Sequence, residues 1–153
     1  MGISKTAPAL ALVLLFAATF LPAQATSKDA ALETIGGTSG AFLYNSYTTL
    51  GILADAYGAE AYESEFTIQI IEEQIAIYAE LITQYQGLLD SGFLEDVNDQ
   101  DFTREIILSL GLLTDEARTL KSFVATEGEG DDAAFQESRQ AAWDSIAELL
   151  GIE

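Results

Sequence analysis

Aromatic side chains with polar groups are the residues of this chain best suited to form a ligand pocket or a protein interface. Their rings supply apolar area, and a tyrosine hydroxyl or an indole N–H supplies a hydrogen-bonding group. The candidate ligand or interface residues are Tyr44, Tyr47, Tyr57, Tyr78, Tyr85, Arg139 and Trp143. Their helical spacing is equally typical of a packed core, in which a buried hydroxyl needs a partner or water.

Arg139 is the unusual member of this set. It lies four residues after Phe135 and four before Trp143, on a mostly apolar helix face. One interpretation is that its guanidinium binds an internal carboxylate such as Asp55 or Glu72, or an anionic ligand. The other is that its stem covers Trp143 while the charged group reaches water.

Several kinds of catalysis are excluded by residue type. The chain has no histidine and no cysteine, so it has no thiolate nucleophile, no imidazole metal ligand and no Ser-His pair. Covalent haem attachment and ferritin-like di-iron sites also need these residues. We therefore expect no enzymatic activity, no catalytic residues, no cofactor and no dedicated metal site.

The stretch 96–101 has oxygen-bearing side chains at the first, third and fifth positions of a calcium loop. The sixth position is Asp101 instead of glycine, and the twelfth is Ile107 instead of glutamate. Helix capping explains these side chains more simply, with Asn98 or Asp99 as the cap. Weak cation binding by the acidic surface remains open.

Four helical stretches account for most of the chain, because their apolar residues recur at alternating steps of three and four. The predicted helices span residues 41–57, 60–90, 98–126 and 132–150. Short connections and apolar stripes predict an all-α, up-down-up-down antiparallel four-helix bundle. Gly58 is expected to separate the first two helices, although a single kinked helix fits the same spacing. Gly111 in mid-helix predicts a close helix contact.

The N-terminus has the three parts of a secretory signal: Lys5, an apolar run over residues 7–21, and Ala23-Gln24-Ala25. We expect residues 1–25 to be a signal peptide cleaved between Ala25 and Thr26. Residues 26–40 then form a flexible, glycine-rich leader with one helical turn over residues 29–34, and residues 41–153 form the bundle domain. The exported chain, periplasmic or secreted, has no predicted transmembrane segment and no disulfide.

The formal net charge of −19 becomes −20 when the signal peptide removes Lys5, its one charged residue. Such a charge disfavours nucleic acid and anionic lipids as partners. The first predicted helix has Asp55 as its one charged residue and is apolar nearly all round, which favours a core or partner position. The leading hypothesis is a non-enzymatic interaction or self-association module of the cell envelope, with a protein partner or as a homo-oligomer. The alternative is a small-ligand or cation-binding periplasmic carrier or sensor-like bundle.

Overall fold

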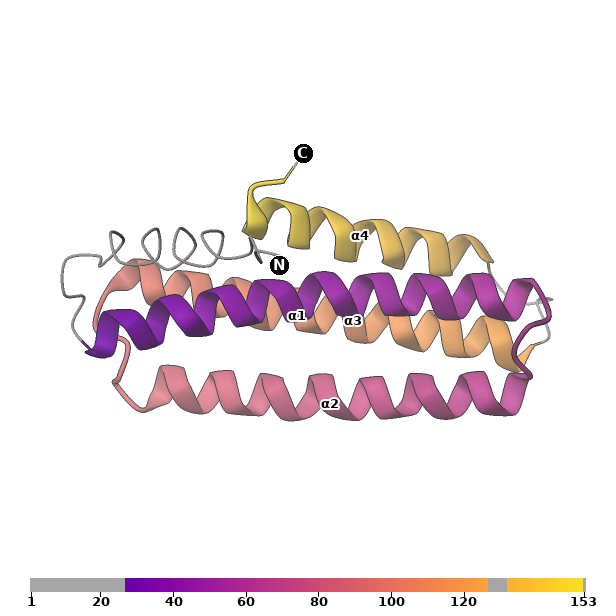
Figure 1. Cartoon of the computed structure of the whole chain (residues 1–153), viewed down its shortest axis with the longest axis horizontal. Helices are drawn as coiled ribbons and strands as arrows, with labels where there is room; N and C mark the ends of the chain where they lie inside the picture. Colours follow the sequence, from indigo (N-terminus) through magenta and orange to yellow (C-terminus); the bar gives the residue numbers. More distant parts are fainter. Residues whose placement is uncertain (1–26, 127–131, 153) are drawn as a thin grey trace, which may run out of the picture. The chain divides into compact units, whose positions relative to one another are not determined.

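All regular structure in the described residues is helical. The computed structural model describes residues 27–126 and 132–152. Its elements are α1 (Ser27–Gly58), α2 (Ser64–Asp90), α3 (Val97–Ala125) and α4 (Asp132–Leu150) (Figure 1). The predicted all-α class is confirmed for these residues, and α1 and α2 are separate helices. None of the described helices is both long enough and apolar enough to cross a membrane.

By its internal contacts the chain divides into two units, Met1–Thr34 and Ile35–Glu153. The described part of the first unit is the opening of α1, where the Thr34 hydroxyl donates to the Ala30 carbonyl oxygen over 2.8 Å. The predicted signal peptide and its cleavage site after Ala25 lie outside the described residues.

Helix α1 begins well before its predicted start at Ala41. The expected flexible leader over residues 26–40 is therefore wrong for the part that the structure describes. Small residues in this stretch allow close packing and do not end the helix. A Cβ atom added at Gly40 would lie 2.6 Å from a methyl group of Leu150, and Ser39 is buried. A glycine-rich run thus marks a helix contact here, since its backbone is approached by another element.

Serine and tyrosine side chains face each other between α1 and α2. The hydroxyl oxygens of Ser39 and Tyr85 are 2.5 Å apart and share a hydrogen bond. One heptad along α1, Ser46 interacts with the Tyr78 hydroxyl. The order of these contacts is reversed along α2. Ile71 and Tyr78, which lie seven residues apart on one face of α2, are fully buried.

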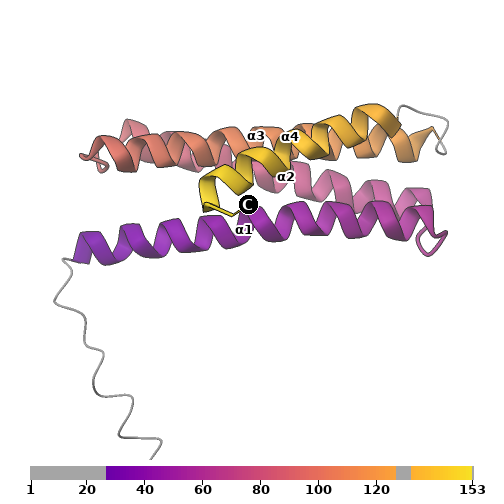
Figure 2. The same ribbon diagram turned by 90° about the horizontal axis from the view of Figure 1, so that it is seen from above.

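Helices α1 and α4 meet through two glycines of α1 and one aromatic pair. The contacts, in order along α1, are Gly40 with Leu150, Tyr47 with Trp143, and Gly51 with Arg139. Their order is also reversed along α4, whose C-terminal end lies next to α1 (Figure 2). Two of the three contacts use a glycine, so α4 approaches the backbone of α1 closely.

Helix α3 contacts both α2 and α4 and has more buried residues than the other described helices. The predicted alternation of three and four is confirmed on this helix, because the residues at these steps are buried: Thr103, Ile106, Leu110, Leu113, Ala117, Leu120 and Val124. The prediction for Gly111 is wrong, because no atom of another element lies within 4 Å of a Cβ built there.

The ends of α3 and α4 follow from capping. Asp96 caps α3, and its carboxylate accepts a hydrogen bond from the Asn98 N–H over 2.7 Å. The capping interpretation of stretch 96–101 is therefore confirmed, although the cap is Asp96 and not Asn98 or Asp99. The predicted bounds of α4 are also confirmed, with Gly151 directly after it.

Helices α1 and α4 end in the same hydrogen-bonded turn with different residues in its left-handed position. After α4 this residue is Gly151, with φ of 63°, whereas after α1 it is Glu60, with φ of 55°. In both turns the left-handed residue bonds three residues back and the next N–H bonds five residues back. Gly58, the predicted cap, does not adopt a positive φ. Glu60 therefore occupies a position that favours glycine.

We predict that Glu60→Gly raises the free energy of unfolding by about 1 kcal/mol, because a left-handed conformation costs a residue with a Cβ roughly that much. Urea denaturation monitored by circular dichroism measures the change. Glu63→Gly is the matched control, since Glu63 has an extended backbone with φ of −73° and should gain nothing. A loss of stability in Glu60→Gly would contradict the assignment of strain.

Candidate functional site

A buried ion pair joins α3 to α4 beneath α1. The Arg139 guanidinium donates from Nη1 to Oε1 of Glu116 over 3.1 Å. The Glu116 side chain is 0% exposed and that of Arg139 is 25% exposed. The guanidinium also lies 4.4 Å from the centre of the Tyr47 ring and packs against Gly51. Three helices therefore meet at one charged group.

The structure decides between the two interpretations of Arg139. It is paired with a carboxylate, but the partner is Glu116 and neither Asp55 nor Glu72. Glu72 instead accepts a hydrogen bond from Lys121 over 2.6 Å. The aromatic ring beneath the guanidinium belongs to Tyr47 and not to Trp143.

Sequence reasoning missed Glu116, although its position carries a signal. It lies three residues after Leu113 and four before Leu120, so it shares the buried face of α3. A glutamate among these apolar residues predicts a buried charge with a partner, because an unpaired one is very costly.

Two buried oxygens near this pair have no hydrogen-bond partner among the described residues. They are Oε2 of Glu116 and the hydroxyl of Tyr78. Ser46 is near enough to act on the Tyr78 hydroxyl, but the two do not reach hydrogen-bonding geometry. A buried polar group without a hydrogen-bond partner lowers the stability of the fold by roughly 1–3 kcal/mol. The centre of the bundle is thus polar and incompletely satisfied.

Burial dominates the electrostatics of both groups. It raises the pKa of Glu116 to about 8, against the opposing effects of the charge and hydrogen bond of Arg139. Burial also raises the pKa of Tyr78 to about 12, which the Ser46 interaction lowers and the charge of Glu116 raises further. Burial therefore works against the charged form of Glu116, and the Arg139 guanidinium works in favour of it.

We predict that wild-type stability relative to Glu116→Gln falls by roughly 4 kcal/mol between about pH 5 and pH 9. A pKa raised from 4.5 to about 8 favours the neutral form in the folded state. Its stabilisation is complete below pH 4.5 and is lost as the pH rises through about 8. Denaturant titrations of both proteins across this range measure the difference.

Glu105→Gln is the control for the pH series, because Glu105 is exposed on the same helix. It should show no such change relative to wild type. If the difference in unfolding free energy between wild type and Glu116→Gln stays constant with pH, Glu116 of the folded chain keeps one protonation state throughout this range.

We predict that Gly51→Ala destabilises the fold by at least about 1 kcal/mol, although alanine favours helices by nearly that amount. Its Cβ would collide with the Arg139 guanidinium and displace it from Glu116. Gly111→Ala is the matched control, since space is open there and only the propensity gain of up to about 1 kcal/mol remains. Thermal or urea unfolding compares the two, and equal gains would contradict the role of Gly51.

Outside this pair, aromatic rings of α1 and α4 form a groove. Trp143 lies with its ring centre 5.2 Å from that of Tyr47 and 6.4 Å from that of Tyr44. With Thr48 and Gln140 these residues line a groove of about 450 Å³. None of the five lining side chains carries a formal charge, which is unusual on so acidic a chain.

The structure distributes the seven predicted site residues over three places. Tyr44, Tyr47, Arg139 and Trp143 come together at the α1–α4 surface. Tyr78 and Tyr85 face serines of α1 at the α1–α2 seam. Tyr57 stands apart, beside Phe123 near the end of α3.

No group of three or more acidic residues, histidines or cysteines able to hold a metal ion occurs in the described part of the chain. Comparison with protein-family models, with curated proteins and with solved structures finds no match to the chain.

Proposed function

We propose that this chain is an exported, non-enzymatic protein that acts in the cell envelope by self-association, through a two-fold contact of its α1 surface. Export rests on the signal pattern of residues 1–25. We also propose an up-down-up-down order for the bundle, supported by the reversed contacts of α1 with α2 and with α4. The single observation that carries self-association is an uncharged strip of exposed α1 residues, which includes Tyr44 and Ile52, on a chain of net charge −19.

The strip is the set of exposed residues over positions 37–52 of α1, and none of them carries a formal charge. Its members are Gly37, Thr38, Ala41, Tyr44, Asn45, Thr48 and Ile52. Two copies of so acidic a chain repel each other over most of their surfaces. Because the strip itself has no charged residue, two copies can approach there with less repulsion, and tyrosine is typical of interface centres.

The strip also has a shape that fits a second copy. Ile52, 60% exposed, projects two turns beyond Tyr44, which is 46% exposed and forms one wall of the aromatic groove. Thr48 lies midway between them on the same face. If two α1 helices pair antiparallel about Thr48, Ile52 of each copy meets the groove of the other. A two-fold interface requires this self-complementarity.

We predict that Thr48→Cys forms a covalent dimer on mild oxidation, because a two-fold axis at this position brings the two thiols within bonding reach. Non-reducing gel electrophoresis of the purified chain detects it. The chain has no native cysteine, so the crosslink can form only at the introduced thiol. Ala76→Cys, on the exposed face of α2, is the control and should form no covalent dimer under the same conditions.

Light scattering on a sizing column provides a second measurement of the same interface. Ile52→Asp should weaken the dimer at least about tenfold, whereas Leu108→Asp, at an apolar α3 residue of 52% exposure, should not. Added salt should strengthen association, since it screens the repulsion between copies. A wild-type chain that remains monomeric at high salt and high concentration would overturn the proposal.

A further inference from the structure

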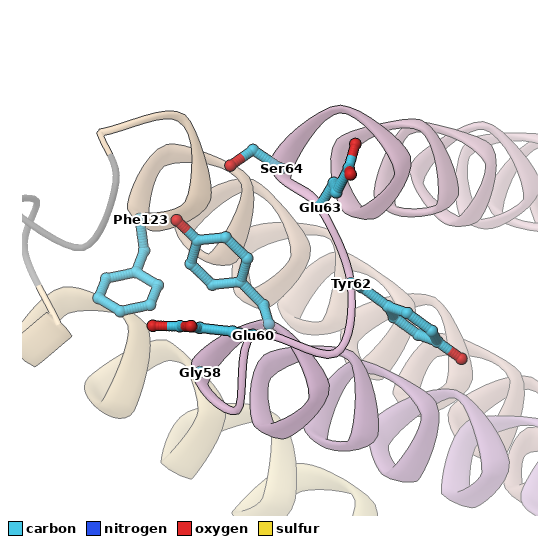
Figure 3. Close-up of a pocket in the computed structure, with 7 residues that line it drawn as sticks. Gly58, Glu60, Tyr62, Glu63, Ser64 and Phe123 are labelled. Atoms are coloured by element: carbon cyan, nitrogen blue, oxygen red, sulfur yellow. The ribbon is translucent and has the colours of Figure 1, made fainter.

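A separate pocket lies where α1 ends and α2 begins. Its volume is about 420 Å³ (Figure 3). Its lining residues are Tyr57, Gly58, Glu60, Tyr62, Glu63, Ser64 and Phe123. It shares no residue with the α1–α4 groove, so ligand binding in this pocket does not depend on self-association.

Aromatic rings form the inner wall of this pocket. Tyr57 and Phe123 meet edge to face with ring centres 6.0 Å apart. The Tyr57 hydroxyl donates to the Val124 carbonyl oxygen over 3.3 Å, which fixes the ring between the two helices. A fixed ring can bind a ligand without a further loss of side-chain freedom, and the faces of such rings carry the negative part of the ring quadrupole.

Two carboxylates complete the lining. The Glu60 side chain points toward Phe123, whereas Tyr62 points away from it (Figure 3). Among the described residues, neither Glu60 nor Glu63 forms an ion pair, and no lysine or arginine lines the pocket. These carboxylates are thus available to a ligand.

Helix ends add to the negative potential. The last turns of α1 and α3 both reach the pocket, through Gly58 and Phe123, and neither turn contains a basic residue. Each contributes the negative end of a helix dipole. The start of α2 at Ser64 opposes them with one positive end, but Glu63 precedes it and its side chain does not cap the helix.

We propose that this pocket binds a small organic cation of the alkylated-ammonium class. Such a cation is weakly hydrated, so it gains from the ring faces of Tyr57 and Phe123 while the Glu60 carboxylate balances its charge. An anion is disfavoured by both carboxylates. A hard metal ion needs more oxygen ligands than two exposed side chains supply, and it gains little from the rings.

Titration of the chain with choline, followed by NMR or calorimetry at constant ionic strength, tests this assignment. Saturable binding with a dissociation constant on the order of 1 mM is expected. The neutral isostere 3,3-dimethylbutan-1-ol should bind at least about tenfold more weakly, because it has the shape of choline without the charge. Equal binding of the two, or no saturation by choline, would overturn the proposal.

Variants locate the site. Glu60→Gly removes a carboxylate while relieving the left-handed strain at this position, so weaker binding cannot be ascribed to unfolding. It and Phe123→Leu should each weaken choline binding about fivefold or more. Glu105→Gln removes an exposed carboxylate elsewhere and should leave binding unchanged. Equal affinity in all three variants would place binding outside the pocket.

N-acetyl-lysine amide distinguishes a small ligand from the side chain of a protein partner. Binding of choline in preference to this amide supports a small alkylated cation. If the amide binds more tightly than choline and displaces it, the pocket prefers a primary ammonium group and the proposal is wrong.

Discussion

The guanidinium of Arg139, on α4, contacts both α1 and α3, and the residues packed around it are those that its charge and size require. It needs Glu116 of α3 as its partner, the ring of Tyr47 beneath it and a glycine, Gly51, beside it. A buried ion pair adds little stability compared with apolar residues of the same volume, because desolvation offsets most of the attraction. Separating its members is costly, however, so packings that misplace α4 are disfavoured. We infer that the pair specifies where α4 lies more than it strengthens the fold.

Helix α1 has opposite requirements on its two faces. Toward its neighbours it presents glycine and serine, which let α2 and α4 approach its backbone. Toward solvent, over residues 37–52, it presents uncharged side chains that include the exposed Tyr44 and Ile52, on a strongly acidic chain. The same inward face buries Leu43, Leu50 and Leu53 in the core, whereas the outward residues leave apolar area exposed. This exposed apolar area is what the proposed contact between two copies would cover.

The sequence predicts those features that depend on one helix at a time. The seam of α3 and the bounds of α4 follow from apolar spacing and from capping, which are local. The start of α1 does not, because Gly40 looks like a helix breaker until Leu150 is placed against it. The partner of Arg139 is likewise hidden, since heptad spacing shows that Glu116 faces inward but not which helix it meets. The left-handed conformation of Glu60 could not be predicted either, because by residue type the nearby Gly58 suits this position of the turn better.

Two unequal spacings run along α1. Its serine contacts with α2, at Ser39 and Ser46, are one heptad apart, whereas its glycine contacts with α4, at Gly40 and Gly51, are three helical turns apart. Sliding α1 by one heptad along α2 keeps one serine opposite a tyrosine. The contacts with α2 alone therefore discriminate poorly between the observed register and the shifted one. The same slide puts a tyrosine of α1 where a glycine now lies against α4, and no ring fits there. The contacts with α2 and the contacts with α4 are therefore satisfied together in one register of α1, which neither neighbour would impose by itself.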